Sequence, residues 1–432
     1  MIRRTVVVVL FLACMCCVSA RAQSPAVTLL QAGKLLDVRS GTLLADHAIL
    51  VEGDKIAEVG PAAEVAKRAP AGAVRVNLPG LTLVPGLVDC HAHVLGNLED
   101  LSATAQLRVS SPQLALWGYH NLQVWLDHGF TTLRDAGESD LAYGQLALRD
   151  SINRGLIRGP RMVSAGNYIS VTGGHGDADV LSADNALARR PNLTDSVADM
   201  GPAVRHEIKY GVDWIKLIAT GGISDPMSDF NVQELSEEQM KEAVAVAHRA
   251  HKKVMAHAEG VDGIKAAVRA GVDSIEHGTM LDNEAAGMMA KNGTWLVPTV
   301  SVFQRYAQIG SESGLDKVAL EKSRTILRYQ SAAFQSALKY QVKIALGLDD
   351  DPRFLPRELP AMVKQGMKPI EALQAATVNA ADLLGMSGQI GTLEKGKFAD
   401  IIAVVGDPTK DIDVMSNVVF VMKGGEVIKQ AK

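Results

Sequence analysis

The sequence contains little cysteine, and most of it lies in one short N-terminal stretch. Three of the four cysteines, Cys14, Cys16 and Cys17, fall in this apolar stretch, and the fourth is Cys90. If the stretch is removed, the mature chain can form no internal disulfide, which excludes a disulfide-stabilised scaffold. The chain must then be stabilised by a buried core and by any metal it binds. Cys90 lies in a predicted buried strand, where we expect it to pack rather than to act as a nucleophile.

Clusters of one charge are also missing. The 44 lysines and arginines nearly balance the 48 aspartates and glutamates, and neither sign forms a block or a tail. This excludes the strongly basic surface typical of nucleic-acid binding, so we expect no nucleic-acid partner. Aromatic residues make up only 4% of the chain, whereas glycine is plentiful, with 39 residues. That composition suits an α/β protein with many short turns.

The N-terminus has the three parts of a secretory signal peptide. Arg3 and Arg4 form the basic segment, residues 6–12 begin the apolar segment, and Ala20-Arg21-Ala22 is a small-x-small cleavage site. The apolar run is too short to span a bilayer comfortably, which argues against a membrane anchor. We therefore predict a signal peptide over residues 1–22 and an exported, periplasmic or secreted protein with no membrane attachment after cleavage.

The mature chain divides into three parts by its hydrophobic patterning. Residues 23–86 contain short alternating strands punctuated by glycines, which predicts part of a small β domain. Residues 87–387 alternate apolar strands with amphipathic helices, and eight such units predict a closed (β/α)8 barrel of the TIM type. Residues 388–432 return to strand patterning and are expected to complete the small domain, a β-sandwich built from both chain ends. A doubly wound open sheet is the alternative, but no Gly-x-Gly-x-x-Gly follows a strand.

Histidines collect at the ends of the predicted barrel strands. Residues 81–93 predict a Pro-Gly turn and a buried strand that ends in His91 and His93, two residues apart and so on one face. Two imidazoles on one face can bind a divalent metal. The active-site residues of such barrels lie at the carboxyl ends of the strands. The further candidates at these ends are Lys216, His257, His277 and Asp349.

Lys216 is unusual because it lies inside the apolar strand predicted over residues 214–219. A buried ammonium group is costly unless it is paired or neutralised. Two interpretations remain open: an ordinary lysine that reaches the surface, or a lysine whose amine has reacted with carbon dioxide. The resulting carbamate would turn a buried cation into an anion able to bridge two metals.

Taken together, these motifs resemble the amidohydrolase superfamily over nearly the whole mature chain. The most similar branch contains metal-dependent dipeptidases and carboxypeptidases, among them Xaa-Pro dipeptidases, Lys/Arg carboxypeptidases and ochratoxin amidases, and is related to imidazolonepropionase. The matching stretches are residues 85–93, 129–135, 172–177, 215–216, 256–258, 274–278 and 391–400.

The resemblance implies a site with two divalent metal ions. Zinc suits the nitrogen-rich ligand set. Two metals can generate hydroxide near neutral pH and polarise a carbonyl, and Asp349 would carry the proton from water to the leaving nitrogen. The family also implies a homo-oligomer. The resemblance assigns one metal to His91, His93 and Asp349, the other to His257 and His277, and a bridging role to carboxylated Lys216.

The resemblance also places substrate contacts around the strand ends. His175, on a glycine-rich loop, is expected beside the substrate and in the catalytic set, and Tyr168 and Arg134 are further candidates for binding a substrate carboxylate. One departure from the family pattern concerns the acid–base residue. The chain has Gly-Leu-Asp-Asp-Asp where the family usually has Gly-Thr-Asp, and the loop that follows is shorter. Asp350 therefore remains a rival to Asp349.

The sequence thus predicts a metal-dependent enzyme that hydrolyses the amide bond of small substrates with a free carboxylate. Dipeptides and N-acyl amino acids, including ochratoxin-type amides, fit this class. Two alternatives stay open. One is hydrolysis of a cyclic amide, as in imidazolonepropionase. The other is an exported binding protein that keeps the fold without turnover.

Overall fold

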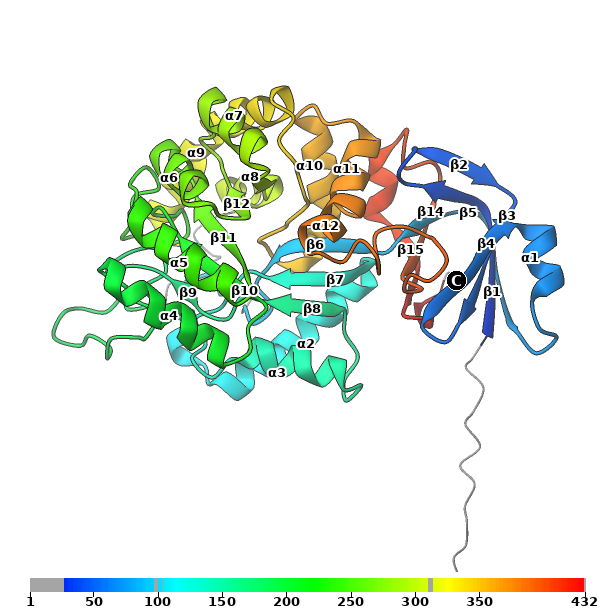
Figure 1. The fold of residues 1–432 in the computed structure, drawn as a ribbon, viewed down its shortest axis with the longest axis horizontal. Helices are drawn as coiled ribbons and strands as arrows, with labels where there is room; N and C mark the ends of the chain where they lie inside the picture. Colours follow the sequence, from blue (N-terminus) through cyan, green and yellow to red (C-terminus); the bar gives the residue numbers. More distant parts are fainter. Residues whose placement is uncertain (1–26, 97–99, 103, 310–313, 431–432) are drawn as a thin grey trace, which may run out of the picture.

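The computed structural model describes residues 27–96, 100–102, 104–309 and 314–430, so the predicted signal peptide lies outside the described residues. Figure 1 shows two parts: a large one, in which helices surround central strands, and a sheet at one end formed by the beginning and the end of the chain. None of the helices described combines the length and the apolar character that a membrane crossing requires.

The end sheet is built from both ends of the chain (Figure 1). Its members are β1 (Val27–Asp37), β2 (Thr42–Ala45), β3 (His47–Glu52), β4 (Lys55–Pro61), β5 (Val74–Pro85), β14 (Ile401–Val405), β15 (Val418–Lys423) and β16 (Glu426–Lys429). The strand order is β16-β15-β14-β5-β1-β3-β4, with β2 paired to β1. β5 joins the two halves because it pairs with β1 on one side and with β14 on the other. The described strands therefore form one continuous sheet, and the packing of two layers in a β-sandwich stays a prediction.

Alternation of side chains explains how this sheet buries both faces. In β1, Leu30 faces a core that includes Ile49, whereas Leu29 faces the opposite side. There Leu29 and Leu50 pack with Val65 of helix α1 (Ala62–Arg68). The register confirms the alternation, since Leu29 pairs with Leu50 and Leu30 with Ile49.

The large part contains parallel strands in two hydrogen-bonded sheets, so the predicted closed barrel is not present as one continuous sheet. One sheet has the order β6-β7-β8 and the other the order β13-β12-β11-β10-β9. Their bounds are β6 (Leu87–Ala92), β7 (Phe130–Asp135), β8 (Arg161–Ser164), β9 (Tyr168–Ile169), β10 (Trp214–Ile218), β11 (Lys253–Ala258), β12 (Ser274–His277) and β13 (Trp295–Val297).

Residues 343–346, which belong to the predicted eighth strand (343–347), lie between the two sheets. The backbone of Leu296 in β13 donates to Lys343 and accepts from Ala345, at 2.8 and 3.0 Å. On the other side, the amide of Cys90 in β6 donates to the carbonyl of Leu346 at 2.9 Å. Because this segment bonds both sheets, it brings the residues that follow it next to β6.

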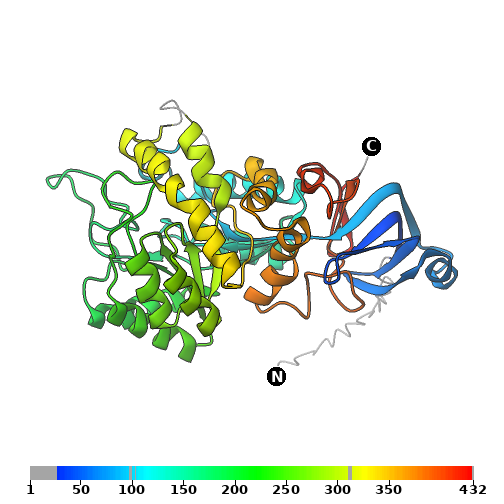
Figure 2. The same cartoon turned by 90° about the horizontal axis from the view of Figure 1, so that it is seen from above.

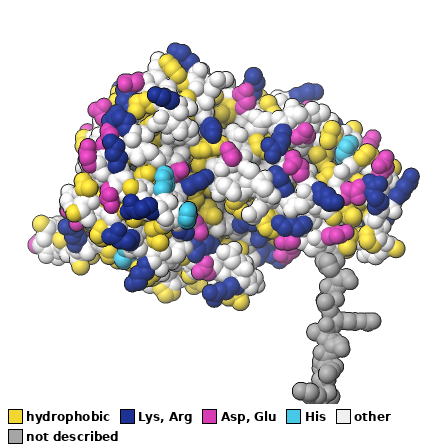
Figure 3. Space-filling model, viewed as in Figure 1, with side chains coloured by type: hydrophobic (Ala, Val, Ile, Leu, Met, Phe, Trp, Pro, Cys, Tyr) yellow, Lys and Arg dark blue, Asp and Glu magenta, His cyan; other side chains and the backbone are white. Residues whose placement is uncertain are grey.

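Helices cover the outside of these strands (Figures 1 and 2). Helix α5 (Glu237–Arg249) shows why: Ser236 and Gln239 cap its start reciprocally, and Met240, Ala243 and Ala247 bury one face. Lysines, arginines and acidic residues are interspersed over the face drawn in Figure 3. The α-helices of this part are α2 (Ser111–Asp127), α3 (Gly144–Asn153), α4 (Val197–Lys209), α5 (Glu237–Arg249), α6 (Val261–Ala270), α7 (Asn283–Asn292), α8 (Val300–Gln308), α9 (Lys317–Lys339), α10 (Glu358–Lys364), α11 (Pro369–Ala375) and α12 (Val378–Leu383).

Candidate metal and active site

A cavity of about 320 Å3 lies where the parallel strands end. Its wall includes the six side chains that the sequence suggested as metal ligands, together with His175 and Tyr168. Each of the six lies in or just after a strand, so the strand ends bring together residues that are far apart in the chain. The six are His91 in β6, His93 just after it, Lys216 in β10, His257 in β11, His277 at the end of β12 and Asp349 after the segment 343–346.

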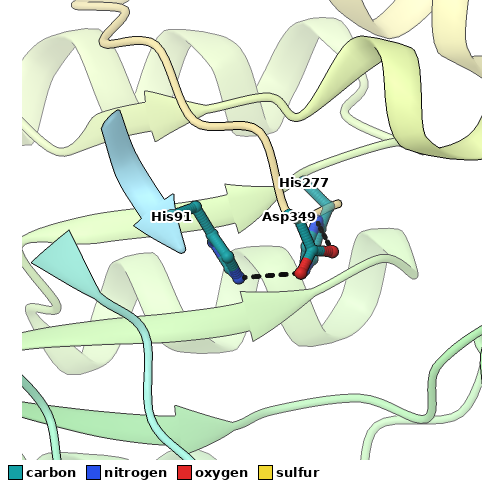
Figure 4. A group of neighbouring side chains, drawn as sticks. All are labelled: His91, His277 and Asp349. Carbon is teal, nitrogen blue, oxygen red and sulfur yellow. Dashed lines mark ion pairs between the residues drawn. The ribbon is translucent and has the colours of Figure 1, made fainter. Parts of the chain in front are cut away.

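The carboxylate of Asp349 lies among the histidines. One of its oxygens is 3.2 Å from Nε2 of His93 and 3.5 Å from Nε2 of His91, and the other is 3.8 Å from Nδ1 of His277. Figure 4 shows His91, His277 and Asp349 pointing toward one another, and these three offer ligand atoms within 4.8 Å of each other. The ring of His257 lies 4.7 Å from that of His277, which extends the cluster.

The donor atoms of this cluster suit a divalent metal. Nδ1 of His91 lies 2.7 Å from the Glu276 carboxylate, while its buried Nε2 has no hydrogen-bond partner among the described residues. His93 and His277 likewise use Nδ1 for a bond to the protein, with the carbonyl of Gly137 and the hydroxyl of Thr299, each at 2.7 Å. A metal-binding histidine is usually fixed in this way, through the ring nitrogen that does not bind the metal.

Burial also favours the protonation state that metal binding needs. It is the largest cause that lowers the pKa of His91, His257 and His277 well below the ordinary value. A neutral imidazole is the form that binds metal. These three histidines are therefore ready to bind a cation without first losing protons. His93 is not: Asp349 beside it outweighs burial and raises the pKa of this imidazole to about 9, so His93 must lose a proton when it binds metal.

Lys216 lines the same cavity and is only 2% exposed. It therefore does not reach the outer surface as an ordinary lysine would. Burial lowers the pKa of its ammonium group to about 8. A neutral amine, the form that reacts with carbon dioxide, is accordingly more accessible here than for a lysine in water.

Two site residues adopt backbone conformations that side chains other than glycine rarely take. His277 has φ of 71° and Asp349 has φ of 57°. Such left-handed conformations cost about 1–3 kcal/mol and persist at functional sites because the surrounding structure imposes them. Gly347 explains the close approach on this side: a Cβ atom there would lie 2.7 Å from Cβ of His91 and 2.4 Å from Val297.

The geometry favours Asp349 over its rival Asp350. Asp350 is bound by Arg305, whose Nη1 donates to its Oδ1 at 2.7 Å. Its side chain is 2% exposed, and burial raises its pKa to about 7. Asp350 is thus held by an arginine at the cavity wall, whereas Asp349 lies among the histidines.

The predicted substrate contact by Arg134 is wrong. Its guanidinium is completely buried, donates to Glu276 through Nη2 at 2.8 Å to each oxygen, and does not belong to the cavity wall in the described part of the chain. Nε donates to the carbonyl of Cys90 at 2.6 Å, and Nη1 donates to Ser274 at 3.0 Å. Arg134 therefore supports Glu276, which in turn holds His91.

Several residues of the site were missed by the sequence analysis. Glu276 is fully buried beside His91, and its only sequence signal is an acidic residue inside an apolar strand. Glu259, two residues after His257, also lines the cavity, and burial raises its pKa to about 8. The other missed residues of the cavity wall include Glu138, Asp225 and Tyr306.

Comparison with known proteins identifies the family of the chain. The sequence model of the Amidohydrolase family matches residues 82–428, and that of the Imidazolonepropionase-like composite domain, bacteria, matches residues 48–71. Ochratoxinase of Aspergillus niger is 33% identical over 441 residues, which cover 95% of this chain and 88% of that protein. Imidazolonepropionase of Sphingopyxis alaskensis is 28% identical, covering 85% of this chain and 89% of the relative.

Solved structures resemble most of the chain. A Xaa-Pro dipeptidase with methionine bound in its active site superposes with a TM-score of 0.85 at 33% identity, covering 93% of this chain and 99% of that one. The structure of ochratoxinase from A. niger gives a TM-score of 0.82 at 31% identity, with 94% and 96% covered. These matches extend over nearly all the described residues and both parts of the fold. The chain belongs to the amidohydrolase family.

Proposed function

We propose that this protein hydrolyses the amide bond of dipeptides or N-acyl amino acids that carry a free carboxylate. The observation that carries the proposal is the convergence of His91, His277 and Asp349 on one cavity, with Nε2 of His91 left without a hydrogen-bond partner among the described residues. Similarity to ochratoxinase and to a Xaa-Pro dipeptidase supports a hydrolase of this chemical class. An ochratoxin-type amide is included among the substrates.

The six residues at the strand ends would hold two divalent metal ions, for which zinc is best suited. We assign His91, His93 and Asp349 to one ion, His257 and His277 to the other, and a carboxylated Lys216 to both. When bound, the metal would lower the pKa of a water molecule and polarise the amide carbonyl.

Asp349 would move the proton during hydrolysis. Burial disfavours its charged form, but the nearby His91 and His93 outweigh burial and lower the pKa of this carboxyl below its ordinary value. An ionised carboxylate can accept the proton of the attacking water and pass it to the leaving nitrogen. His175 and Tyr168, in the same cavity wall, would contact the substrate.

Three further features belong to the proposal. The two parallel sheets would form one closed (β/α)8 barrel, joined by residues 165–167 on one side and 343–346 on the other. The signal-like composition of residues 1–22 supports export to the periplasm or secretion. We also propose a homo-oligomer, as the family resemblance implies.

A matched pair of substrates tests the proposal: a dipeptide or N-acyl amino acid, and the same molecule with its carboxylate capped as an amide. Because Arg134 does not reach the cavity, it cannot pair with the carboxylate of the substrate. That carboxylate would instead be bound by hydrogen bonds, and a hydrogen bond to a charged group contributes about 1.5–3 kcal/mol. We expect kcat/KM to fall roughly 10- to 150-fold on capping. Asp349→Asn, purified in parallel, controls for contaminating peptidases.

Hydrolysis of a cyclic amide is the second candidate, favoured by the imidazolonepropionase relative. A cyclic imidazolone substrate belongs in the same assay. Equal turnover of the free and capped compounds, together with faster turnover of the cyclic amide, would overturn the first candidate in favour of the second. A metal-loaded protein that turns over neither class would point to a binding protein instead.

A further inference from the structure

The imidazole ring of His175 is packed tightly at the cavity wall. Its ring lies 4.6 Å from the ring of His257, and its backbone amide donates to Glu234 at 3.0 Å. On another side it rests on Gly222, where a Cβ atom would lie within 2.2–2.4 Å of three ring atoms. The ring therefore has its place only because residue 222 has no side chain.

One ring nitrogen of His175 is bound by a carboxylate. Its Nδ1 lies 2.5 Å from Oδ2 of Asp225, on a loop 50 residues later in the chain. Both side chains are largely buried, with exposed fractions of 16% and 18%, and both line the cavity. Since a carboxylate accepts hydrogen bonds, the proton lies on Nδ1, which leaves Nε2 as the nitrogen available to a substrate.

Asp225 is itself held rigidly. Its Oδ1 accepts from the amides of Met227 and Ser228 at 2.9 and 2.7 Å, and its Oδ2 accepts from the hydroxyl of Ser228 at 2.6 Å. Burial opposes its ionisation, but the bonds to His175 and Ser228 outweigh burial and lower the pKa of this carboxyl. Its orientation is thus fixed before any substrate arrives.

Lys322 of α9 binds the backbone of the loop that carries Asp225. Its ammonium donates to the carbonyls of Gly222 and Asp225 at 3.1 and 2.7 Å, and to that of Ser228. The ammonium group of Lys322 therefore binds both Gly222, on which the His175 ring rests, and Asp225, which binds Nδ1 of that ring. Loop, carboxylate and ring form one connected unit.

We propose that Asp225 is a positioning residue that fixes the ring orientation and the tautomer of His175, so that Nε2 faces the substrate in the cavity. The inference rests on the proposed function, in which His175 contacts the substrate. Asp225 acts only through His175 and takes no part in metal binding. Lys322 and Gly222 maintain the loop conformation that this contact requires.

A double-mutant cycle tests the assignment. Asp225→Ala should lower kcat about 10- to 100-fold, by analogy with carboxylates that orient metal-binding histidines, with metal content unchanged. Asp225→Asn keeps an oxygen acceptor and should lose less. In a His175→Ala background, Asp225→Ala should cause no further loss, because its effect passes through the absent ring. Asp229→Asn, on the same loop but exposed and outside the cavity wall, is the matched control.

The tautomer can be read without any turnover. The full chain is labelled with 15N-histidine, and the long-range correlations between the ring nitrogens and ring protons are recorded by NMR. The signals of His175, assigned by their loss in His175→Ala, should show a protonated Nδ1. That pattern of signals should change in Asp225→Ala and not in Asp229→Asn. If the wild-type protein hydrolyses no amide, the proposed function fails while this measurement still decides the role of Asp225.

Two results would overturn the inference. One is an undiminished loss from Asp225→Ala in the His175→Ala background, which would mean that Asp225 only stabilises the loop. The other is an unchanged His175 pattern in Asp225→Ala or a wild-type Nδ1 without a proton. Should Asp225→Ala fail to fold, Asp225→Asn undergoes the same cycle and the same NMR comparison.

Discussion

Removing the charge of Glu276 should affect the protein in two separable ways. Its carboxylate accepts two hydrogen bonds from Arg134 at 2.8 Å, and it lies 2.7 Å from Nδ1 of His91. Arg134 and Glu276 are both completely buried. Glu276→Gln keeps the shape of the side chain but leaves the arginine without its counter-charge and His91 without a charged acceptor.

The expected magnitudes follow from these contacts. Breaking a buried ion pair by removing one partner costs about 3–5 kcal/mol of unfolding free energy, because the other charge stays buried. Loss of the acceptor behind a metal-binding histidine typically lowers metal affinity about 10- to 100-fold. Both effects should appear in Glu276→Gln, the first in metal-free protein and the second in metal titrations.

The assays must keep the two effects apart, since bound metal itself stabilises the folded state. Urea unfolding of chelator-treated protein measures stability, and competition with a chelator measures metal affinity. Glu426→Gln is the control: its pair with Arg158 at 3.0 Å is more than half exposed on both sides, so it should cost less than about 1 kcal/mol. If Glu276→Gln unfolds at the same urea concentration as this control and binds metal like the wild type, the supporting role of Glu276 is refuted.

Three further predictions concern the site itself. About two transition-metal ions per chain should be found by elemental analysis and lost together with activity on chelation; an active metal-free protein would contradict the metal assignment. Lys216→Ala should lose most metal and activity, and short carboxylic acids should restore part of both, whereas full activity would show that the lysine is merely structural. Asp349→Asn should lose at least the roughly 10²–10⁴-fold that general acid–base catalysis supplies, and Asp350→Asn much less; the reverse order in kcat would make Asp350 the catalytic acid.

The cluster of candidate ligands could be predicted because its signal is local. A histidine or aspartate that follows a short apolar strand lies at the carboxyl end of that strand, and parallel strands bring their carboxyl ends together at one edge. His91, His257 and Asp349 were found in this way, and all three line one cavity. The strands themselves were predicted from the short apolar runs that alternate with the amphipathic helices.

The residues behind that cluster could not be predicted, since their partners are distant in the chain. Glu276 and Arg134 are separated by 142 residues, and Asp225 and His175 by 50. Arg134 was wrongly expected at the substrate because proximity to a strand end does not reveal which side of the strand its side chain occupies. The loop that carries Asp225 has no regular pattern at all, and its conformation depends on Lys322 of a distant helix.

The sheet shared by the two chain ends has a consequence for biosynthesis. β5 and β14 pair along residues 81–85 and 401–405, so one edge of β5 has no partner until more than three hundred further residues have been made. At about 5–20 residues per second, that interval lasts roughly 15–60 s. During it, the apolar edge formed by Leu83 and its neighbours is open to pairing with other chains. Ribosome stalling or a premature stop before residue 401 should therefore yield aggregates rather than a partly active protein.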